Sequence, residues 1–400
     1  MSLKFTIEKE LTNGRGRVGK IETTHGVINT PAFIVVGTKG TVKALTSEQV
    51  FSLGTEAVLA NTYHLYLQPG EGIVRQAGGL HKMMNWSGPT FTDSGGFQAF
   101  SLGVAFNNKV GKIQESSDGE VFTPANLPNF AKVDEDGVIF KSIIDGSSHR
   151  FTPERSIEIQ QNIGADIIFA FDECTSPHAP YVYQKEAMER THRWAQRSLS
   201  YHRANVKNSI NPTQSIFGIV QGGRHEDLRK ESAKIIGKMD FDGFGIGGSF
   251  DKEDIYTAVG WVNDILPKQK PRHLLGIGEP ADIFGGIESG VDTFDCVSPT
   301  RIARNGGLYT RDGQINILNA KFKNDFEKID AQCFCYTCSH YSHAYLSHLF
   351  RAKEILGSTL ASIHNLYFIV NLVKEIRVSM LEGKFEEFRK SFLERYYKNN

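Results

Sequence analysis

Short apolar segments rich in β-branched and aromatic residues recur along the first 300 residues, and most are followed by a segment with helical periodicity. Eight of these segments are predicted to be strands: 32–36, 57–60, 90–92, 167–171, 216–220, 243–246, 273–275 and 293–294. Helices are predicted between many of them, at 153–163, 184–204, 226–238, 252–265 and 280–289. Regular strand–helix alternation with eight strands favours an α/β fold of the (β/α)8 barrel type over a doubly wound sheet.

Two regions depart from this alternation. Residues 107–135 are polar and only weakly periodic, which predicts an insertion on the surface of the barrel. After residue 300 the alternation stops, and a cysteine-rich segment precedes a long amphipathic helical stretch at 344–397. We therefore predict a barrel body at 1–300 and, at 301–400, a zinc-binding subdomain with C-terminal helices.

The composition is that of a globular protein, with 40% hydrophobic and 22% charged residues, and it disfavours disorder, collagen and coiled coil. No uncharged apolar stretch of membrane-spanning length occurs, and the first residues lack a secretory signal, so we expect a cytoplasmic protein without a membrane partner. The 45 basic residues equal the 45 acidic ones. Residues 301–400, however, contain 15 basic and 10 acidic residues, so an anionic partner is expected there.

Three of the five cysteines form the cluster Cys333-x-Cys335-x-x-Cys338. Thiolates at this spacing, together with an imidazole, suit one tetrahedral Zn²⁺ in a reducing compartment. A closed site with four protein ligands would be structural. The spacing leaves the fourth ligand open among four downstream histidines, namely His340, His343, His348 and His364.

Polar residues and glycines follow the predicted strands, at the face where (β/α)8 enzymes build their active sites. They are Asn61, His64, Asp93, Ser94, Asp172, Glu173, Gln221, Gly247, Gly248, Gly276, Gly278 and Asp295. A single acid at such a position more often caps a helix or braces a loop. Three acids on one face, Asp93, Asp172 and Asp295, indicate a functional site.

Two further motifs lie beside these acids. The segment Gly243-Phe-Gly245-Ile-Gly247-Gly248 matches the spacing of a dinucleotide-binding loop, but it belongs to the sixth strand and lacks the acid that should end a following strand. Glycines there favour a planar base lying against the main chain. Arg301 and Arg304 follow the strand that carries Asp295, and paired arginines suit contacts to a phosphodiester backbone.

With these residues assembled, the sequence resembles the tRNA-guanine transglycosylase family, also called queuine tRNA-ribosyltransferases, over nearly its whole length. The resemblance is carried by strings in the same order: NTYHLYLQPG, TDSGGFQ, SIEIQ, AFDEC, GIVQGG, FDCVSPTRIARNG, the cysteine cluster and SIHN. It implies an irregular (β/α)8 TIM barrel with a zinc-bearing insertion and extra helices. It also implies a pentosyltransferase that replaces guanine at the tRNA wobble position with a 7-deazaguanine.

The resemblance implies a role for each matching residue. Asp295 is similar to the nucleophile that attacks ribose C1′, and Asp93 to the general acid/base. The base-binding residues would be Ser94, Asp172, Gln221, Gly247 and Gly248, with the base between Phe97 and Leu275. Arg301 and Arg304 are similar to contacts to the tRNA backbone. The zinc ligands would be Cys333, Cys335, Cys338 and His364.

The implied partners are a tRNA with a GUN anticodon, a 7-deazaguanine base and a second copy of the chain in a homodimer. Cys174, after Asp172 and Glu173, is the bacterial type of residue and favours preQ1 (7-aminomethyl-7-deazaguanine) over queuine. Three departures qualify the resemblance: the longer 107–135 segment, Leu275 in place of a usual Met, and Ser249 in place of a usual Leu in the base pocket.

Two alternatives from other functional classes remain. A non-catalytic tRNA-binding subunit of a heteromeric queuine transferase could lose its nucleophile, and the presence of both Asp93 and Asp295 disfavours it. A metal-dependent barrel hydrolase would need several histidine and carboxylate ligands at strand ends, and His64 is the only prominent histidine near one. A related enzyme acting on another tRNA position would usually carry an added RNA-binding domain, for which the C-terminus leaves no room.

Overall fold

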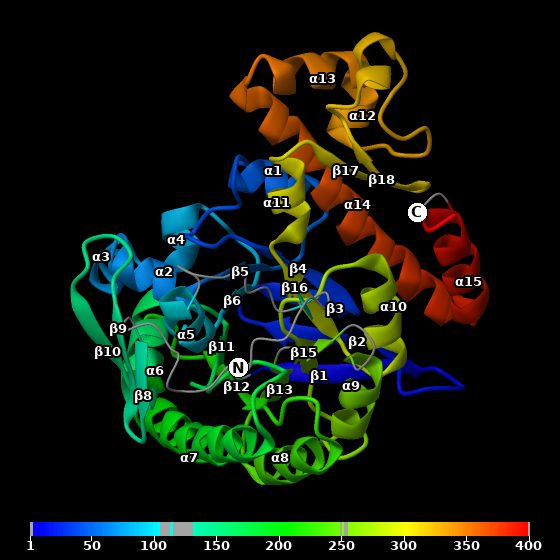
Figure 1. Ribbon diagram of the computed structural model, residues 1–400. Helices are drawn as coiled ribbons and strands as arrows, with labels where there is room; N and C mark the ends of the chain where they lie inside the picture. Colours follow the sequence, from blue (N-terminus) through cyan, green and yellow to red (C-terminus); the bar gives the residue numbers. More distant parts are fainter. Residues whose placement is uncertain (1–2, 105–112, 115–130, 249, 252–254, 399–400) are drawn as a thin grey trace.

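Eight parallel strands form a closed barrel in the computed structural model, which describes residues 3–104, 113–114, 131–248, 250–251 and 255–398 (Figure 1). The eight predicted strands are confirmed, with ends that shift by one or two residues. Around the barrel they are β4 (Ala32–Val36), β5 (Val58–Ala60), β6 (Thr90–Thr92), β11 (Ile167–Phe169), β12 (Ser215–Val220), β13 (Gly243–Ile246), β15 (Arg272–Leu274) and β16 (Thr293–Cys296).

The predicted helices lie on the outside of the barrel. They are α6 (Pro153–Ile163), α7 (Tyr181–Asn205), α8 (Glu226–Lys238), α9 (Ile255–Asn263) and α10 (Pro280–Glu288); the predicted start of α9 at 252–254 lies outside the described residues. Helix α6 shows why the bounds were predictable. Its Thr152 side chain accepts a hydrogen bond from the Arg155 backbone N–H, and Gly164 ends it in the left-handed conformation at φ +79°.

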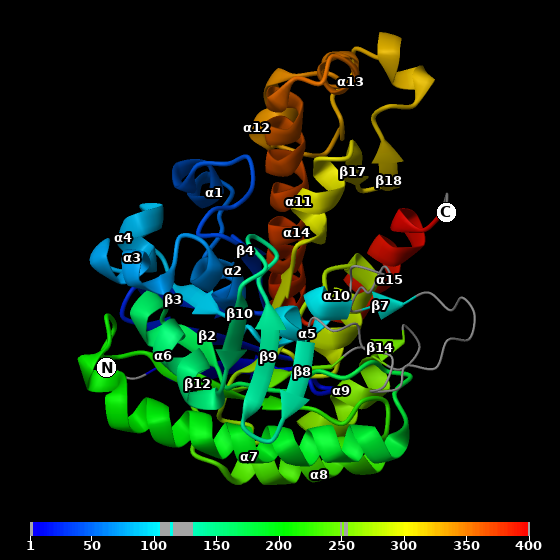
Figure 2. The same ribbon diagram turned by 60° about the vertical axis from the view of Figure 1, so that its left-hand side comes forward.

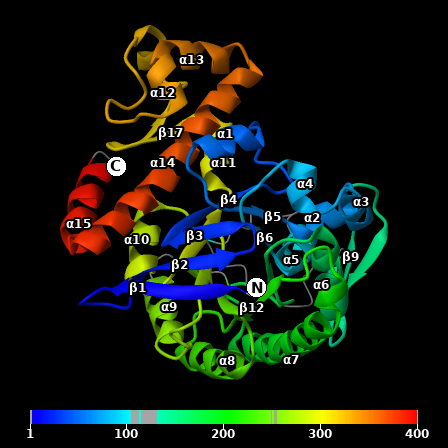
Figure 3. The same ribbon diagram turned by 180° about the vertical axis from the view of Figure 1, so that it is seen from behind.

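Apolar side chains fill the interior of the barrel as far as the N-terminal ends of the strands. Phe91, Phe169 and Phe217 pack there with Ile21 and Ile28 in one buried cluster. The last two residues come from an antiparallel sheet of β1 (Lys4–Glu10), β2 (Arg17–Thr23) and β3 (Gly26–Thr30), which lies across this end of the barrel (Figure 3). The sequence pattern did not indicate this covering sheet, because β1 is mostly exposed and charged.

Three aspartates tie neighbouring strands together at the same end of the barrel. Each directly precedes one strand and accepts a backbone N–H from the start of the strand before it in the barrel. The donor–acceptor pairs are Thr90 N to Asp166 Oδ2 at 2.8 Å, Ile216 N to Asp242 Oδ2 at 2.9 Å, and Arg272 N to Asp292 Oδ2 at 2.7 Å. Each bond gives a carboxylate partner to a backbone N–H group at the start of a strand.

Asp166 also holds two segments that are distant in the sequence. His25 Nδ1, in the β2–β3 turn, lies 2.6 Å from Asp166 Oδ1, and His81 Nε2, in α4 (Leu80–Met84), lies 3.1 Å from Oδ2. The two imidazole rings stack on each other with centroids 3.7 Å apart. Asp166 is only 3% exposed, so one buried carboxylate joins the covering sheet, α4 and the barrel.

Most of the predicted surface insertion at 107–135 lies outside the described residues. Within it, β7 (Ile113–Gln114) pairs in parallel with β14 (Phe250–Asp251), which follows the sixth barrel strand. Residues Ala131–Asp134 form β8, which joins β9 (Gly137–Lys141) and β10 (Ser148–Phe151) in a small antiparallel sheet beside the barrel (Figure 2).

After the barrel, the chain builds a lobe that projects away from it (Figures 1 and 2). The lobe contains α11 (Ser298–Ala303), β17 (Gly307–Thr310), β18 (Gly313–Asn316), α12 (Tyr336–His340) and α13 (His343–Arg351), and α14 (Ile355–Glu382) and α15 (Phe385–Tyr396) follow. The predicted single helical stretch at 344–397 is thus three helices. The three helices are separated near Lys353 and at Gly383, because a residue with a positive φ angle ends a helix.

Helix α14 connects the lobe to the barrel. Its Ile369, Val373 and Ile376 belong to the same buried cluster as Phe33 and Val35 of β4. By length and composition alone, α14 could cross a membrane, but 67% of its most apolar window is buried inside the protein. The apolar character of α14 is therefore explained by its packing inside the protein.

Replacing the carboxylate that ties three segments together tests the importance of this end of the barrel. We expect Asp166→Asn to lower the free energy of unfolding by about 3–5 kcal/mol, because removing one partner of a buried charged network leaves the others unpaired. The measurement is chemical or thermal unfolding followed by circular dichroism. Asp240→Asn is the control, since its side chain is 88% exposed and the change should be nearly neutral.

The pH dependence of stability should change in the same variant. In Asp166, burial raises the carboxyl pKa, but hydrogen bonds from His25 and His81 outweigh it and hold the pKa below its usual range. That contribution is present above about pH 4 and is lost as the pH falls. The hydrogen bond to Asp166 raises the pKa of His25, so its contribution is present below about pH 6.5 and is lost as the pH rises. In Asp166→Asn, the free energy of unfolding should depend less on pH both at acidic pH and near neutral pH. A pH dependence equal to that of the wild type would contradict this account.

Candidate active site

Asp295 lies near the C-terminal end of β16, at the opposite end of the barrel from the covering sheet. Its carboxylate Oδ1 accepts the Gly276 backbone N–H at 2.9 Å and lies 3.1 Å from Nε2 of His273. The Asp295 side chain is 13% exposed. The carboxylate is therefore held in one orientation while part of it stays open to solvent, as a reacting group needs.

Asp93 follows β6 on the same end of the barrel and has its own set of donors. The Thr62 backbone N–H donates to Oδ1 at 2.8 Å, Gln98 Nε2 donates to Oδ2 at 3.0 Å, and Asn61 Nδ2 also donates to Oδ2. Asn61 and Thr62 begin the segment that follows β5, so a neighbouring strand end orients this carboxylate. Asp93 and Asp295 are thus oriented by different donors on one rim.

Asp172, Ser94 and Gln221 form a third polar group. Ser94 Oγ donates to Asp172 Oδ1 at 2.8 Å, and Gln221 Nε2 donates to Asp172 Oδ2 at 2.7 Å. All three residues are at most 6% exposed. The structure therefore joins, through direct hydrogen bonds, three residues that follow three different strands. A buried carboxylate with flanking amide and hydroxyl groups can accept the N–H groups of a planar ligand.

The glycines after β13 approach this group closely. A Cβ atom on Gly247 would lie 2.7 Å from Gln221 Nε2, and Gly248 adopts a φ of +109° that other residues rarely take. Arg229, a fully buried residue of α8, donates to the Gly247 carbonyl at 2.7 Å and to the Gly223 carbonyl at 2.7 Å. The sequence did not point to Arg229, because its helical neighbours give no sign that its side chain is buried.

Phe97 and Leu275 lie on the same rim. Phe97 is partly buried at the start of α5 (Gly96–Val104), and Leu275 is 9% exposed directly after β15. Both follow barrel strands that end at the polar groups just described. Ser249, the departure from the family in the base pocket, lies outside the described residues.

A group of cations lies next to the rim. Arg301 and Arg304 belong to or directly follow α11. Burial lowers the pKa of Lys43, and the charges of Arg304, Lys39 and Arg301 lower it further. Burial and the charge of Arg301 likewise lower the pKa of Arg304. Four cations that influence one another electrostatically favour an anionic ligand between them. A depression of about 580 Å³ lined by Arg301, Asn305 and β17–β18 residues adjoins them.

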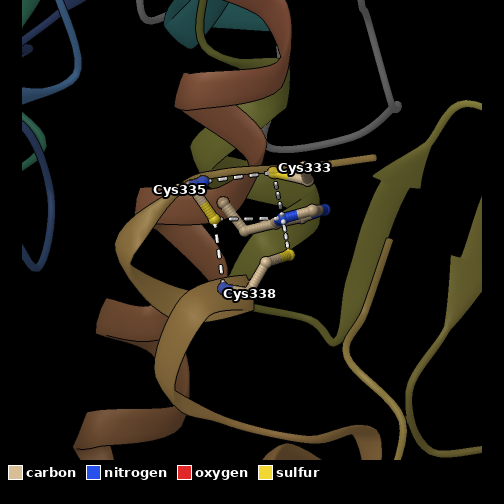
Figure 4. Close-up of side chains that lie close together, drawn as sticks. Cys333, Cys335 and Cys338 are labelled. Atoms are coloured by element: carbon tan, nitrogen blue, oxygen red, sulfur yellow. Dashed lines mark hydrogen bonds between the residues drawn. The ribbon is translucent and has the colours of Figure 1, made fainter. Parts of the chain in front are cut away.

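The three clustered cysteines lie close together in the lobe (Figure 4), and His364 of α14 completes a group of four possible metal ligands. Nδ1 of His364 lies 3.7 Å from Cys333 Sγ, 3.5 Å from Cys335 Sγ and 3.3 Å from Cys338 Sγ. His364 Nε2 lies 2.6 Å from the Tyr309 carbonyl, to which it must donate, so Nδ1 is left to bind a metal. Of the four histidines that the sequence left open, His364 is therefore the one that completes the cluster.

The arrangement combines two anchored carboxylates, a buried acceptor for a planar ligand and an adjacent cationic surface. A carboxylate pair can divide nucleophilic and proton-transfer roles. The four-ligand cluster lies on α12, its preceding loop and α14, away from the strand ends. It can hold a metal that ties the lobe together, but it is not placed to act on a ligand at the barrel rim.

Asn61 and Gly276 were among the predicted strand-end residues, but several other residues that orient the site were not predicted from the sequence. They are His273, Thr62, Gln98, Lys39 and Lys43, which contact the predicted carboxylates or accompany the predicted arginines. Only His273 had a usable signal, since a histidine in a predicted strand directly before Leu274 and Leu275 requires a hydrogen-bond partner if it is buried. The others are ordinary loop or helix residues whose partners are set by the fold.

Comparison with known proteins shows the family to which the chain belongs. The family model described as queuine tRNA-ribosyltransferase matches residues 12–127 and 118–398. A protein named queuine tRNA-ribosyltransferase from Roseiflexus sp. is 47% identical, with 98% of this chain and 100% of the relative covered. A protein of the same name from Caldanaerobacter subterraneus is 45% identical, with 100% of this chain and 99% of the relative covered. Another from Lactococcus lactis is 44% identical, with 99% of this chain and 96% of the relative covered. The chain therefore belongs to the queuine tRNA-ribosyltransferase family.

Proposed function

We propose that this protein is a tRNA-guanine transglycosylase that exchanges guanine at the anticodon wobble position for a 7-deazaguanine through a covalent ribosyl-enzyme. The observation that carries the proposal is the pair of separately anchored carboxylates, Asp295 and Asp93, on one rim of the barrel. Exchange of one base for another at the same carbon with retention needs two inversions, and hence a nucleophile and an acid/base group.

Each half of the reaction uses both carboxylates. In the first half Asp295 attacks ribose C1′, an O–C1′ bond forms, and the C1′–N9 bond breaks with its electron pair going to guanine. Asp93 supplies the proton that the leaving purine requires. In the second half the incoming base attacks C1′, Asp295 leaves as a carboxylate, and Asp93 accepts the proton that the incoming base loses.

The base would bind where Asp172, Ser94 and Gln221 meet. A carboxylate such as Asp172 can accept two N–H groups from the N1/N2 edge of guanine, and Gln221 and the Gly247–Gly248 main chain would face the remaining edge. Phe97 and Leu275 would cover the two faces of a base flipped out of the anticodon loop. Cys174 favours preQ1 over queuine as the incoming base.

The tRNA would contact the cationic group beside the rim. Arg301 and Arg304, together with Lys39 and Lys43, would bind phosphates of an anticodon loop with a GUN sequence. The net positive charge of residues 301–400, which include Arg301 and Arg304, also supports tRNA binding at this surface.

Zinc is the metal that the cluster would hold. Three thiolates and one imidazole are a donor set that Zn²⁺ prefers, and four protein ligands leave no position for a substrate. Its role would be to join the loop at Cys333–Cys338 to α14, and no step of the exchange would pass through it.

We further infer a homodimer in the cytoplasm. Large apolar side chains of the lobe are exposed, including Phe326 (80%), Phe334 (78%) and Ile355 (80%), which supports a protein contact there. Free thiols and a tRNA substrate are both consistent with a cytoplasmic location. The alternative, a non-catalytic tRNA-binding subunit, is disfavoured because both carboxylates are present and anchored.

Removing the nucleophile tests the proposal. Asp295→Ala should lower incorporation of labelled guanine into an unmodified tRNA with a GUN anticodon by at least about 10³-fold, and no covalent RNA adduct should form in denaturing gels. Asp93→Ala should also reduce turnover strongly, with unchanged thermal unfolding in both variants. Competition with unlabelled preQ1 and queuine in the wild-type assay identifies the preferred base. Full exchange by folded Asp295→Ala would refute the assignment.

Breaking the metal cluster should affect stability before chemistry. Cys335→Ser should lose stoichiometric zinc, measured by atomic emission, and should unfold at a lower temperature, because the loop is no longer tied to α14. His340→Ala is the matched control: His340 is an exposed neighbour, and its loss should leave the zinc content unchanged. A metal-free Cys335→Ser protein with wild-type stability would contradict a structural role.

The cationic group should determine how tRNA binding depends on salt. Arg301→Ala should weaken tRNA binding and reduce the slope of log affinity against log salt by about 1, because one phosphate contact is lost. Lys390→Ala serves as the control, since its side chain is 78% exposed on α15. Equal slopes for Arg301→Ala and wild type, in fluorescence titrations, would place the RNA elsewhere.

A further inference from the structure

His273 lies inside the barrel, next to the carboxylate that attacks the ribose in the proposed function. It is 0% exposed on β15, and its ring packs against Phe91 and Phe169, with centroid distances of 5.7 and 5.3 Å. Both ring nitrogens have polar neighbours on the adjacent strand β16. Nδ1 lies 2.8 Å from Thr293 Oγ1, and Nε2 lies 3.1 Å from Asp295 Oδ1.

The register of the two strands explains this bridge. His273 pairs with Thr293 across the parallel ladder, and Thr293 and Asp295 are two residues apart, so their side chains face the same side of β16. An imidazole has nitrogens on two sides of the ring and can therefore span two successive inward positions of the neighbouring strand. An aliphatic residue at 273 would fill the space but make neither contact.

The partners also determine where the protons lie. An ionised carboxylate can only accept hydrogen bonds, so Nε2 carries the hydrogen that Asp295 Oδ1 receives. The Thr293 hydroxyl can then donate to the unprotonated Nδ1, so both ring nitrogens have a partner in this tautomer. Together with the Gly276 N–H, Oδ1 receives two donors from different directions, and the plane of the carboxylate is fixed.

We propose that His273 is a positioning residue for the nucleophile: it holds Asp295 Oδ1 so that Oδ2 is directed at ribose C1′, and Thr293 holds the imidazole ring through its Nδ1. This inference rests on the proposed function. As Oδ2–C1′ forms, the C1′–N9 electron pair leaves with the purine, and Oδ1 becomes the ester carbonyl oxygen. When the incoming base attacks C1′, the Oδ2–C1′ pair returns to the carboxylate, which the same two donors stabilise.

Substitution of the imidazole separates positioning from packing. His273→Phe keeps a ring of similar size but removes the donor, and the single-turnover rate of covalent adduct formation should fall by about 10–100-fold, since a misplaced nucleophile loses its attack geometry. The KM for tRNA should stay within about twofold of wild type, because His273 does not lie on the cationic surface. His273→Gln can place an N–H near the Nε2 position and should recover most of the lost rate.

Thr293 provides a second test that leaves the imidazole in place. Thr293→Val removes the hydroxyl and should slow adduct formation, whereas Thr293→Ser retains it and should not. These variants also decide the outcome if His273→Phe fails to fold. Wild-type rates in folded His273→Phe or Thr293→Val would overturn the positioning role, and so would a rise in KM alone. If the wild-type protein forms no adduct with tRNA, the proposed function fails instead.

Discussion

The parallel closure of eight strands is the constraint on which the rest of the structure depends. It brings every strand start to one end of the barrel and every strand end to the other. At the first end, Asp166, Asp242 and Asp292 accept backbone N–H groups across alternate strand pairs. The Asp292 carboxylate also forms a buried ion pair with Arg17, so the covering sheet and the barrel share the same anchors.

The two ends of the barrel have different chemistry because their side chains have different neighbours. Next to the covering sheet, phenylalanines and branched residues exclude water from the barrel interior. At the C-terminal ends of the strands, polar side chains replace the apolar ones. The carboxylates there accept hydrogen bonds from donors at neighbouring strand ends. His273 lies at the boundary, where its ring packs against Phe91 and Phe169 and its Nε2 faces the Asp295 carboxylate. The rigid, apolar-packed strands thus orient the reacting groups at their C-terminal ends.

The lobe extends this arrangement outward. Helix α14 packs on β4 through one part of its length and carries His364 in another, so the metal cluster is connected mechanically to the barrel. Asn365, the next residue, donates to the Pro299 and Gly307 carbonyls at 3.1 and 3.0 Å and thereby holds both ends of the segment that carries Arg301 and Arg304. The cationic surface is in this way positioned by a helix whose other contacts are largely apolar.

The sequence by itself determined the eight barrel strands, the main helices, the acids at the strand ends and the cysteine cluster, because alternation, capping and ligand spacing are local properties. It did not determine the covering sheet, the division of the C-terminal stretch into three helices, or the contacts of His273 and Arg229. Those depend on which strands become neighbours and which side chains then meet. Only the closed barrel decides that, since a hydrogen-bond partner on another strand leaves no periodic trace in the chain.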